Sequence, residues 1–251
     1  DRVRAASQNN LALLDWSEGR MEGAEEQLRE SLTLARRSGD VRGEARALAN
    51  LIELYMQQYR LEEAAGLLQD STGLFAGTLE GREYSKLIFL IVGALSQAGR
   101  RDEAVGLSRR AVTELERYGP KAQQACSLVR AFLVALLRDD GNSSEAWSEA
   151  EKGLSALGRS GDPSLRARFV LEEALIAEGR GDMAEAALLL DRAEKLLREG
   201  DNAAGLAAVA VRRGMLQESL GALDKAASDY RHALRQAERA NDRRGMAVAL
   251  E

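Results

Sequence analysis

The stretch VRAASQNNLALLDWSEGRMEGAEEQLRESLTLARRSGD (residues 3–40) holds two segments of helical character separated by a short break. The first segment covers Val3–Glu18, the break is Gly19-Arg20, and the second covers Met21–Arg37. One alanine of the second segment recurs at intervals of 40 to 42 residues, as Ala24, Ala64, Ala104, Ala146, Ala186 and Ala226. A period of this length built from paired helices is typical of an α-solenoid. The sequence therefore predicts an all-α fold, a right-handed solenoid of about six antiparallel helix pairs plus the start of a seventh.

The composition agrees with a helical array and narrows the possible partners. Apolar residues make up 45% of the chain, and it has only two prolines, so long uninterrupted helices are possible. The net charge of −5 argues against broad nucleic-acid binding through a basic face. Cys126 is the only cysteine, which excludes an intrachain disulfide, and there is no signal peptide or apolar stretch long enough for a membrane span. We therefore expect a cytoplasmic protein without direct nucleic-acid or membrane contact.

Small residues occur at two further positions of the unit, in half of the units at the first and in all six at the second, where they would let neighbouring helices approach closely. In the first helix this position reads Ala12, Ile52, Val92, Val134, Ala174 and Gly214, and in the second it reads Ser31, Ser71, Ala111, Gly153, Ala193 and Ala233. The breaks between units place Asp40, Asp162, Asp201 and Asp242 as N-caps of the following helix, and Pro163 at a first helical position.

This unit resembles the tetratricopeptide repeat, a pair of antiparallel helices with small residues at its eighth and twentieth positions. The resemblance implies one array over residues 1–251, with units at 1–39, 40–79, 80–120, 121–161, 162–200 and 201–241 and a partial unit at 242–251. The long period, about 40 residues, resembles the units of bacterial signal-responsive transcriptional regulators and related multidomain ATPases. Because both ends fall inside the repeat pattern, we expect the chain to be an excerpt of a longer protein.

The sequence offers little material for catalysis. His232 is the only histidine, it falls in a polar column, and we expect it to be exposed. Cys126 lies just before a predicted first helix and is expected to be a small packed residue. One histidine and one cysteine cannot assemble a zinc site or a Ser-His-Asp or Cys-His apparatus, and no phosphate-binding Gly-rich motif is present. We therefore expect no enzyme activity, no metal and no cofactor.

In the resembled family the first helices line a concave groove that binds partners. Carried over position by position, the resemblance implies amides, cations and apolar anchors in this groove: Asn9, Asn10, Trp16, Arg46, Asn50, Met56, Lys86, Phe89, Phe132, Arg138, Arg168 and Arg212. Amides can pair with a peptide backbone, and arginine or lysine can pair with a carboxylate or phosphate. An alternative is that Trp16 and Phe132 fill gaps between units. Chaperone-tail recognition is not expected, because only Asn50 and Lys86 match its five-residue clamp.

Together these features predict a non-catalytic repeat domain that binds a protein, a peptide or a small effector in its groove. It would act as the scaffold or sensing region of a bacterial regulatory protein. One alternative is a structural array that self-associates end to end, including through Met246-Ala247-Val248. Another is the regulatory arm of an ATP-driven signalling protein whose catalytic domain lies outside this chain.

Overall fold

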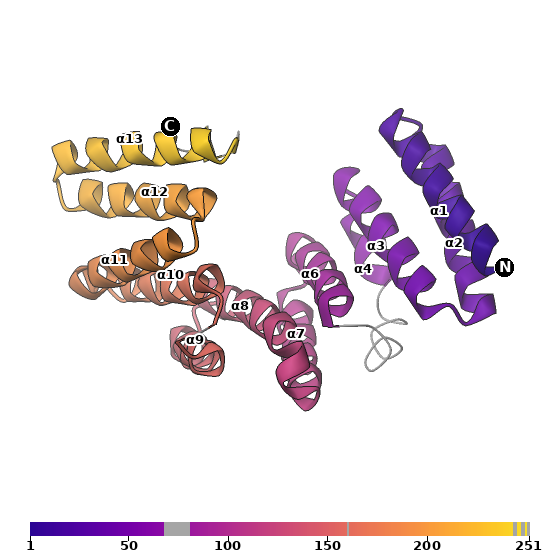
Figure 1. The fold of residues 1–251 in the computed structure, drawn as a ribbon, viewed down its shortest axis with the longest axis horizontal. Coiled ribbons are helices and arrows are strands. Elements are labelled where there is room, and N and C mark those ends of the chain that lie inside the picture. Colours follow the sequence, from indigo (N-terminus) through magenta and orange to yellow (C-terminus); the bar gives the residue numbers. More distant parts are fainter. Residues whose placement is uncertain (68–80, 160, 243–244, 247–248, 250–251) are drawn as a thin grey trace. The chain divides into compact units, whose positions relative to one another are not determined.

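The computed structural model describes residues 1–67, 81–159, 161–242, 245, 246 and 249, with the side chains of 81–84 left aside (Figure 1). This part of the chain forms twelve α-helices and one 3-10 helix, and it contains no strand. The predicted all-α class is therefore confirmed. By its internal contacts the chain divides into two compact units, Asp1–Phe132 (unit 1) and Leu133–Glu251 (unit 2). Each unit is described by itself below.

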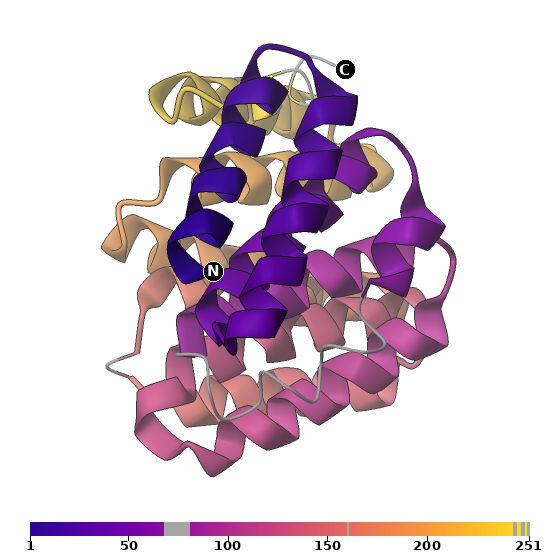
Figure 2. The same ribbon diagram turned by 90° about the vertical axis from the view of Figure 1, so that its right-hand side faces the viewer.

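Unit 1 consists of helix pairs joined by short turns. Figure 2 shows the first pair, α1 and α2, lying side by side. The elements are α1 (Arg2–Ser17), α2 (Met21–Ser38), α3 (Val41–Gln57), α4 (Leu61–Gly66), α6 (Gly81–Gln97), α7 (Arg101–Arg117), the 3-10 helix η1 (Gly119–Ala122) and the first part of α8 (Gln123–Asp139). The predicted packing positions Ser71 and Phe75 lie outside the described residues.

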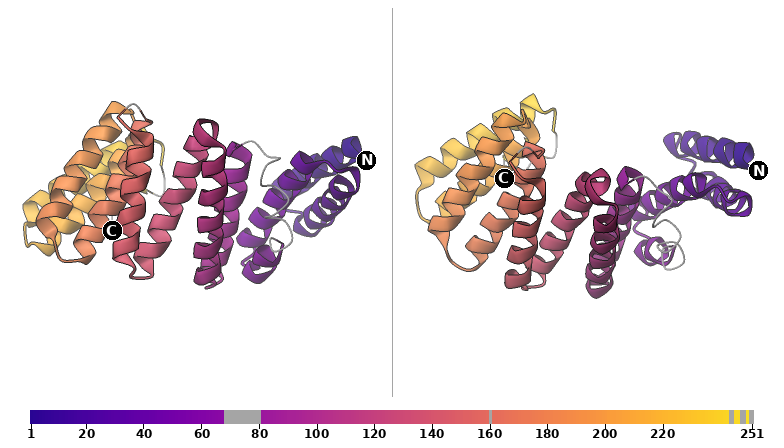
Figure 3. Two further views of the ribbon diagram at one scale, coloured as in Figure 1. Left: turned by 90° about the horizontal axis from the view of Figure 1, so that it is seen from below. Right: turned by 60° about the horizontal axis from the view of Figure 1, so that its bottom comes forward.

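Unit 2 continues the same pattern from the end of α8. Its further helices are α9 (Ser143–Leu157), α10 (Pro163–Gly179), α11 (Met183–Glu199), α12 (Ala203–Ser219) and α13 (Leu223–Arg239). From α9 to α13 each helix packs on the next one in the chain, as the orange-to-yellow helices in Figure 3 show. Their core contains Val170, Leu190, Leu197, Val209 and Leu216, with Trp147 of α9 packed against it.

The recurring alanines lie where the two helices of a pair touch. All six are buried, with exposed fractions of at most 3%. In unit 2, two glycines of the other small columns pack against aromatic rings: the ring of Phe169 lies against Gly153, and the ring of Tyr230 lies against Gly214. A large aromatic side chain fills the space that each missing side chain leaves, which gives interdigitated packing. The small columns thus set the distance between helices.

Every turn from the first to the second helix of a pair uses one residue with a left-handed backbone. Glycine holds this place in five pairs, as Gly19, Gly99, Gly141, Gly181 and Gly221, whereas Tyr59 holds it in the second pair with φ 58°. Glycine has no Cβ and adopts this conformation without steric cost. Tyr59 is 85% exposed and therefore gains little packing in return for the strain.

Most of the predicted helix starts are confirmed, and one is wrong. Asp40, Asp162 and Asp242 each accept a backbone N–H three residues later, from Gly43, Leu165 and Gly245, and Pro163 opens α10. Asp201, however, is not an N-cap. It takes a left-handed conformation with φ 46°, and its neighbour Asn202 caps α12 by accepting the Gly205 N–H at 2.8 Å. The helix therefore starts one residue later than predicted.

Two further expectations concern single residues. Cys126 lies inside the first turn of α8 rather than before the helix, because η1 and α8 together carry the chain from Gly119 onward without a break. It is buried at 7% exposure, as expected for a small packed residue. His232 on α13 is only partly exposed. None of the described helices is long and apolar enough to cross a membrane.

Candidate functional site

Two hollows of the surface contain most of the polar groove residues that the sequence indicates. We call the first helix of each pair an A helix (α1, α3, α6, α8, α10, α12) and the second a B helix (α2, α4, α7, α9, α11, α13). One hollow lies in unit 1 between α3 and α6, and the other lies in unit 2 beside α8, α10 and α12. In both, every described lining residue comes from an A helix or from the segment that follows α13. The A helices therefore provide the candidate binding surface.

The unit 1 hollow has a volume of about 170 Å³. Three of the predicted residues, Arg46, Asn50 and Lys86, come together here on two neighbouring A helices. The full lining is Arg42, Ala45, Arg46, Ala49, Asn50, Lys86 and Leu87. Three of these residues are cations and none of the described lining residues is an acid, although the chain as a whole carries a net charge of −5. The described lining is thus locally basic and also contains the apolar residues Ala45, Ala49 and Leu87.

Asn50 also forms part of a link between two A helices. Its Nδ2 donates a hydrogen bond of 2.9 Å to Oδ1 of Asn9 on α1. Asn9 is only 3% exposed, so it cannot offer its amide to a partner as the sequence pattern suggested. It instead supports Asn50 from behind. Asn10, the next residue of α1, is exposed.

Aromatic side chains lie close to the unit 1 hollow. Phe89 follows Lys86 by three residues on α6, and its ring stacks on Phe132 of α8 with centroids 4.6 Å apart and an interplanar angle of 38°. Phe89 is 45% exposed, so part of its ring remains open to contact. Phe132 is more buried and fills the space between two A helices, which was the alternative role considered for it.

Trp16 and Met56 also lie between A helices. The indole Nε1 of Trp16 on α1 donates to Oε1 of Gln57 at 2.9 Å, which joins α1 to α3. The terminal methyl of Met56 lies against the backbone of Gly93 on α6. Both side chains are only partly exposed. They join neighbouring helices, and neither lines the unit 1 hollow.

The unit 2 hollow is larger, about 510 Å³, and brings Arg138 and Arg212 together. Nη1 of Arg138 pairs with Oε2 of Glu172, and its Nη2 pairs with Asp139 at 2.7 Å. The lining is Arg138, Leu171, Glu172, Leu175, Ala204, Ala207, Ala208, Val211, Arg212, Met215, Asp242 and Gly245. It combines charged residues with apolar residues, and the apolar ones come from α10 and α12.

Burial and charge oppose each other around Glu172, which is 9% exposed. Burial raises the pKa of its carboxyl group, while the positive charges of Arg138, Arg168 and Arg212 act to lower it. Burial likewise lowers the pKa of the Arg168 guanidinium, and the charge of Glu172 acts in the opposite direction. Arg168 does not line the hollow itself. The three predicted arginines of unit 2 thus act on one buried acid, Glu172.

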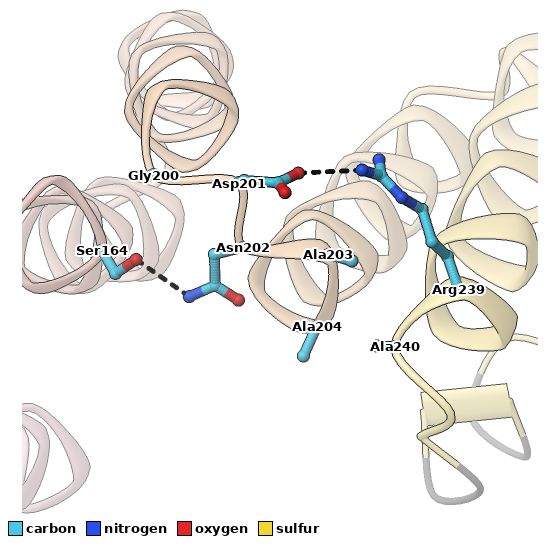
Figure 4. Close-up of a pocket in the computed structure, with 8 residues that line it drawn as sticks. All are labelled: Ser164, Gly200, Asp201, Asn202, Ala203, Ala204, Arg239 and Ala240. Atoms are coloured by element: carbon cyan, nitrogen blue, oxygen red, sulfur yellow. Dashed lines mark hydrogen bonds and ion pairs between the residues drawn. The ribbon is translucent and has the colours of Figure 1, made fainter.

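A third hollow of about 500 Å³ lies at the loop ends of α10, α12 and α13, and Figure 4 shows its lining. Its polar groups already pair with one another. Arg239 Nη2 lies 2.8 Å from Asp201 Oδ1, and Asn202 Nδ2 donates to Ser164 Oγ at 3.1 Å (Figure 4). The first contact joins α13 to the loop before α12, and the second joins the start of α12 to α10, so we assign this hollow a structural role.

Sequence reasoning missed some lining residues that a helical reading could have found. Arg42 precedes Arg46 by four residues and therefore shares its helix face. Leu175 follows Leu171 by the same interval and shares the apolar side of the unit 2 hollow. Among the described residues, no group of three or more His, Cys, Asp or Glu could hold a metal ion. The chemistry of both hollows is that of binding through charge, amides and apolar contact.

The fold is that of tetratricopeptide-repeat proteins, which are solenoids of antiparallel helix pairs. BtubC (BKLC) from P. vanneervenii has a similar structure, with a TM-score of 0.70 and 16% identity over 88% of this chain and 92% of that one. A signal transduction ATPase with a tetratricopeptide repeat sensor from Pyrococcus horikoshii gives 0.63 and 14%, over 97% of this chain and 40% of its own. A Rap protein complexed with competence and sporulation factor gives 0.59 and 12%, over 98% and 72%.

At these identities the likeness shows the fold alone. No family model matches the sequence, and no curated protein matches it. The length of the repeat and the division into units stay predictions.

Proposed function

We propose that this chain is a non-catalytic interaction domain that binds a polypeptide segment of a partner at the unit 1 hollow. It would serve as the scaffold or sensing region of a cytoplasmic bacterial regulatory protein. The observation that carries the proposal is the pair of exposed cations Arg46 and Lys86 in this hollow, next to the half-exposed ring of Phe89. The fold supports it, as does the complex of a similarly folded Rap protein with competence and sporulation factor.

The geometry indicates what kind of segment fits. Arg46 and Lys86 are exposed and would attract a carboxylate, while Phe89 offers an apolar contact one helical turn from Lys86. Three helical residues rise about 4.5 Å along the axis, whereas an extended strand rises about 3.3 Å per residue. An acidic residue and an aromatic or aliphatic residue one or two positions apart would therefore reach both.

A peptide-display selection against the purified chain tests this directly. We expect enriched peptides to contain an acidic residue within two positions of a large apolar one. Lys86→Glu should weaken the best peptide by about tenfold or more in fluorescence anisotropy, because it reverses the attraction. Lys225→Glu on the B helix α13 is the matched charge control, since Lys225 is exposed and lies in unit 2.

Phe89→Ala tests the apolar contact in the same assay. The loss should also be about tenfold, and Leu188→Ala is the control because Leu188 is a 71% exposed residue of a B helix. Equal affinity of Lys86→Glu, Phe89→Ala and the unmodified chain would rule out this hollow as the binding site.

Self-association is the second candidate function. It is favoured by the apolar surface of α1, where Val3, Leu11 and Leu14 are 82%, 50% and 52% exposed. Leu54 and Ile176, at the position corresponding to Leu14 in other pairs, are almost fully buried. Sedimentation over a range of concentrations should show growth that Leu14→Glu abolishes; a monomer at every concentration excludes it. Ala247 and Val248, also considered for end-to-end contact, lie outside the described residues.

A further inference from the structure

The geometry of the unit 2 hollow points to a second, separate site: we infer that it binds a small organic carboxylate with an apolar body. This site lies in a different unit from the peptide site proposed above and does not depend on it. Its volume, about 510 Å³, falls in the range of small-molecule pockets. The inference rests on which charged groups of the hollow already have partners and on the apolar residues that line it.

The first step is the state of Arg138. Its guanidinium is held on two sides, by Glu172 through Nη1 and by Asp139 through Nε and Nη2. Glu172 itself is only 9% exposed and already pairs with Arg138, so little of its carboxylate is accessible to a ligand. Arg138 and Glu172 therefore form a fixed polar wall.

The second step is Arg212, which lines the same hollow from α12. The positive charge of Arg212 acts to lower the pKa of Glu172. Among the described residues, however, the Arg212 side chain makes no hydrogen bond or ion pair. Asp242, the other acid of the lining, accepts the Gly245 N–H at 3.0 Å as a helix cap. Arg212 thus offers a guanidinium whose donors can take a carboxylate in bidentate geometry.

The third step is the apolar side. Leu171 and Leu175 from α10 line the hollow together with Val211 and Met215 from α12, and the small Ala207 and Ala208 of α12 also line it. Met215 is 41% exposed inside this hollow, and a flexible thioether adapts to the shape of a ligand. A carboxylate on Arg212 would thus leave the rest of the molecule on apolar surface.

The methionine methyl groups allow a residue-specific test. The chain has five methionines, and Met215 lies in the unit 2 hollow, whereas Met56 lies in unit 1. We would label the methionine methyls with carbon-13 and titrate the protein with 4-phenylbutyrate and hexanoate. A saturable shift of the Met215 signal with no shift of Met56 is expected. The matched neutral probes, 4-phenylbutyramide and hexanamide, should bind at least about tenfold more weakly.

Variants separate charge from shape. Arg212→Gln should weaken 4-phenylbutyrate at least about tenfold, and Arg212→Lys should weaken it less because the charge remains. Arg46→Gln in unit 1 is the matched control and should leave the Met215 titration unchanged. Because Arg212 is partly exposed, neither variant is expected to unfold the unit, which the dispersion of the methyl spectrum checks.

Three results would overturn the inference. The first is the absence of a saturable Met215 shift with either acid, and the second is equal binding of acid and amide. The third is binding only of peptides with a free carboxyl terminus, measured in parallel with their amidated forms, because the ligand would then be a polypeptide. None of these results bears on the peptide site, which is tested separately by the Lys86→Glu and Phe89→Ala variants.

Discussion

Asn50 on α3 and Asn9 on α1 share a hydrogen bond of 2.9 Å although 41 positions separate them in the chain. The bond joins two successive A helices directly behind the unit 1 hollow. Nδ2 of Asn9 is buried and has no hydrogen-bond partner among the described residues. Asn9 therefore depends on Asn50 for its one side-chain hydrogen bond here.

This dependence predicts an energetic coupling between the two residues. Asn50→Ala should destabilise unit 1 by about 1–2 kcal/mol, because it leaves a buried amide without any partner. Asn50→Ala made in an Asn9→Ala background should cost about 1 kcal/mol less. A double-mutant cycle by urea denaturation measures the difference. Strictly additive effects would show that the hydrogen bond contributes nothing to stability.

The burial of Glu173 leads us to predict that the stability of unit 2 depends on pH. It is 4% exposed on α10, the nearest cation is Arg192 Nη1 at 3.8 Å, and burial raises the pKa of its carboxyl group to about 7. In the unfolded chain the pKa is about 4.3, so the folded state holds the proton more tightly. The contribution of protonated Glu173 to the free energy of unfolding should therefore be fully present below about pH 4.3 and should be lost as the pH rises towards 7.

Glu173→Gln should remove this loss, because a neutral amide of similar shape needs no proton. We expect the variant to be more stable than the unmodified chain by on the order of 2 kcal/mol at pH 8.5, and we expect this difference to shrink steadily as the pH is lowered towards about 4.3. Denaturation across this range measures the profile. Glu178→Gln on the same helix is the control for loss of one negative charge. Parallel pH profiles for Glu173→Gln and the unmodified chain would contradict the prediction.

The close packing of α9 on α10 leads us to predict that position 153 does not tolerate a larger side chain than glycine. A Cβ at this position would overlap the ring of Phe169, which is fully buried. Gly153→Ala should therefore destabilise by about 1–3 kcal/mol, even though alanine favours helices. Gly106→Ala in α7 is the matched control, because its nearest atom is Arg110 Nη1 at 3.9 Å, and it should stabilise by about 0.5–1 kcal/mol. Thermal unfolding of both variants settles the sign.

Tyr59 predicts a stabilising substitution. It adopts φ 58° at a turn position where the five corresponding residues are glycines. Tyr59→Gly should stabilise unit 1 by about 0.5–1 kcal/mol, because relief of strain outweighs the added freedom of the unfolded chain. Tyr118→Gly serves as a control for loss of a half-exposed tyrosine, since Tyr118 has φ −81°. A lower melting temperature for Tyr59→Gly would count against the prediction.

Much of the fold could be predicted because regularly spaced small residues indicate where neighbouring helices pack against each other. The period of Ala24, Ala64 and Ala104 places the helix pairs, and the Asp-containing breaks place most of their starts. Position 201 was misassigned because both Asp201 and Asn202 can cap a helix; in the structure Asn202 caps α12, and Asp201 forms an ion pair with Arg239. That ion pair joins residues 38 positions apart, which periodicity does not reveal.

The polar site residues were harder to predict because their partners also lie far away in the sequence. A helical position indicates a face, but it does not say whether a neighbouring helix covers the side chain. Asn9 and Asn10 are adjacent polar residues, yet one is buried against Asn50 and the other is exposed. Arg138 was expected to face a partner, and the structure pairs it with the buried Glu172. Such contacts depend on the distance between helices, which only the packed structure provides.

Since every described lining residue of both hollows lies on an A helix or beyond α13, the B helices can carry engineered attachments. A cysteine introduced at an exposed B-helix site such as Leu188 could hold a fluorophore or a surface linker without obstructing either hollow. The buried native thiol of Cys126 would compete poorly for such labelling. The B helices of this protein are therefore suited to building an immobilised optical biosensor.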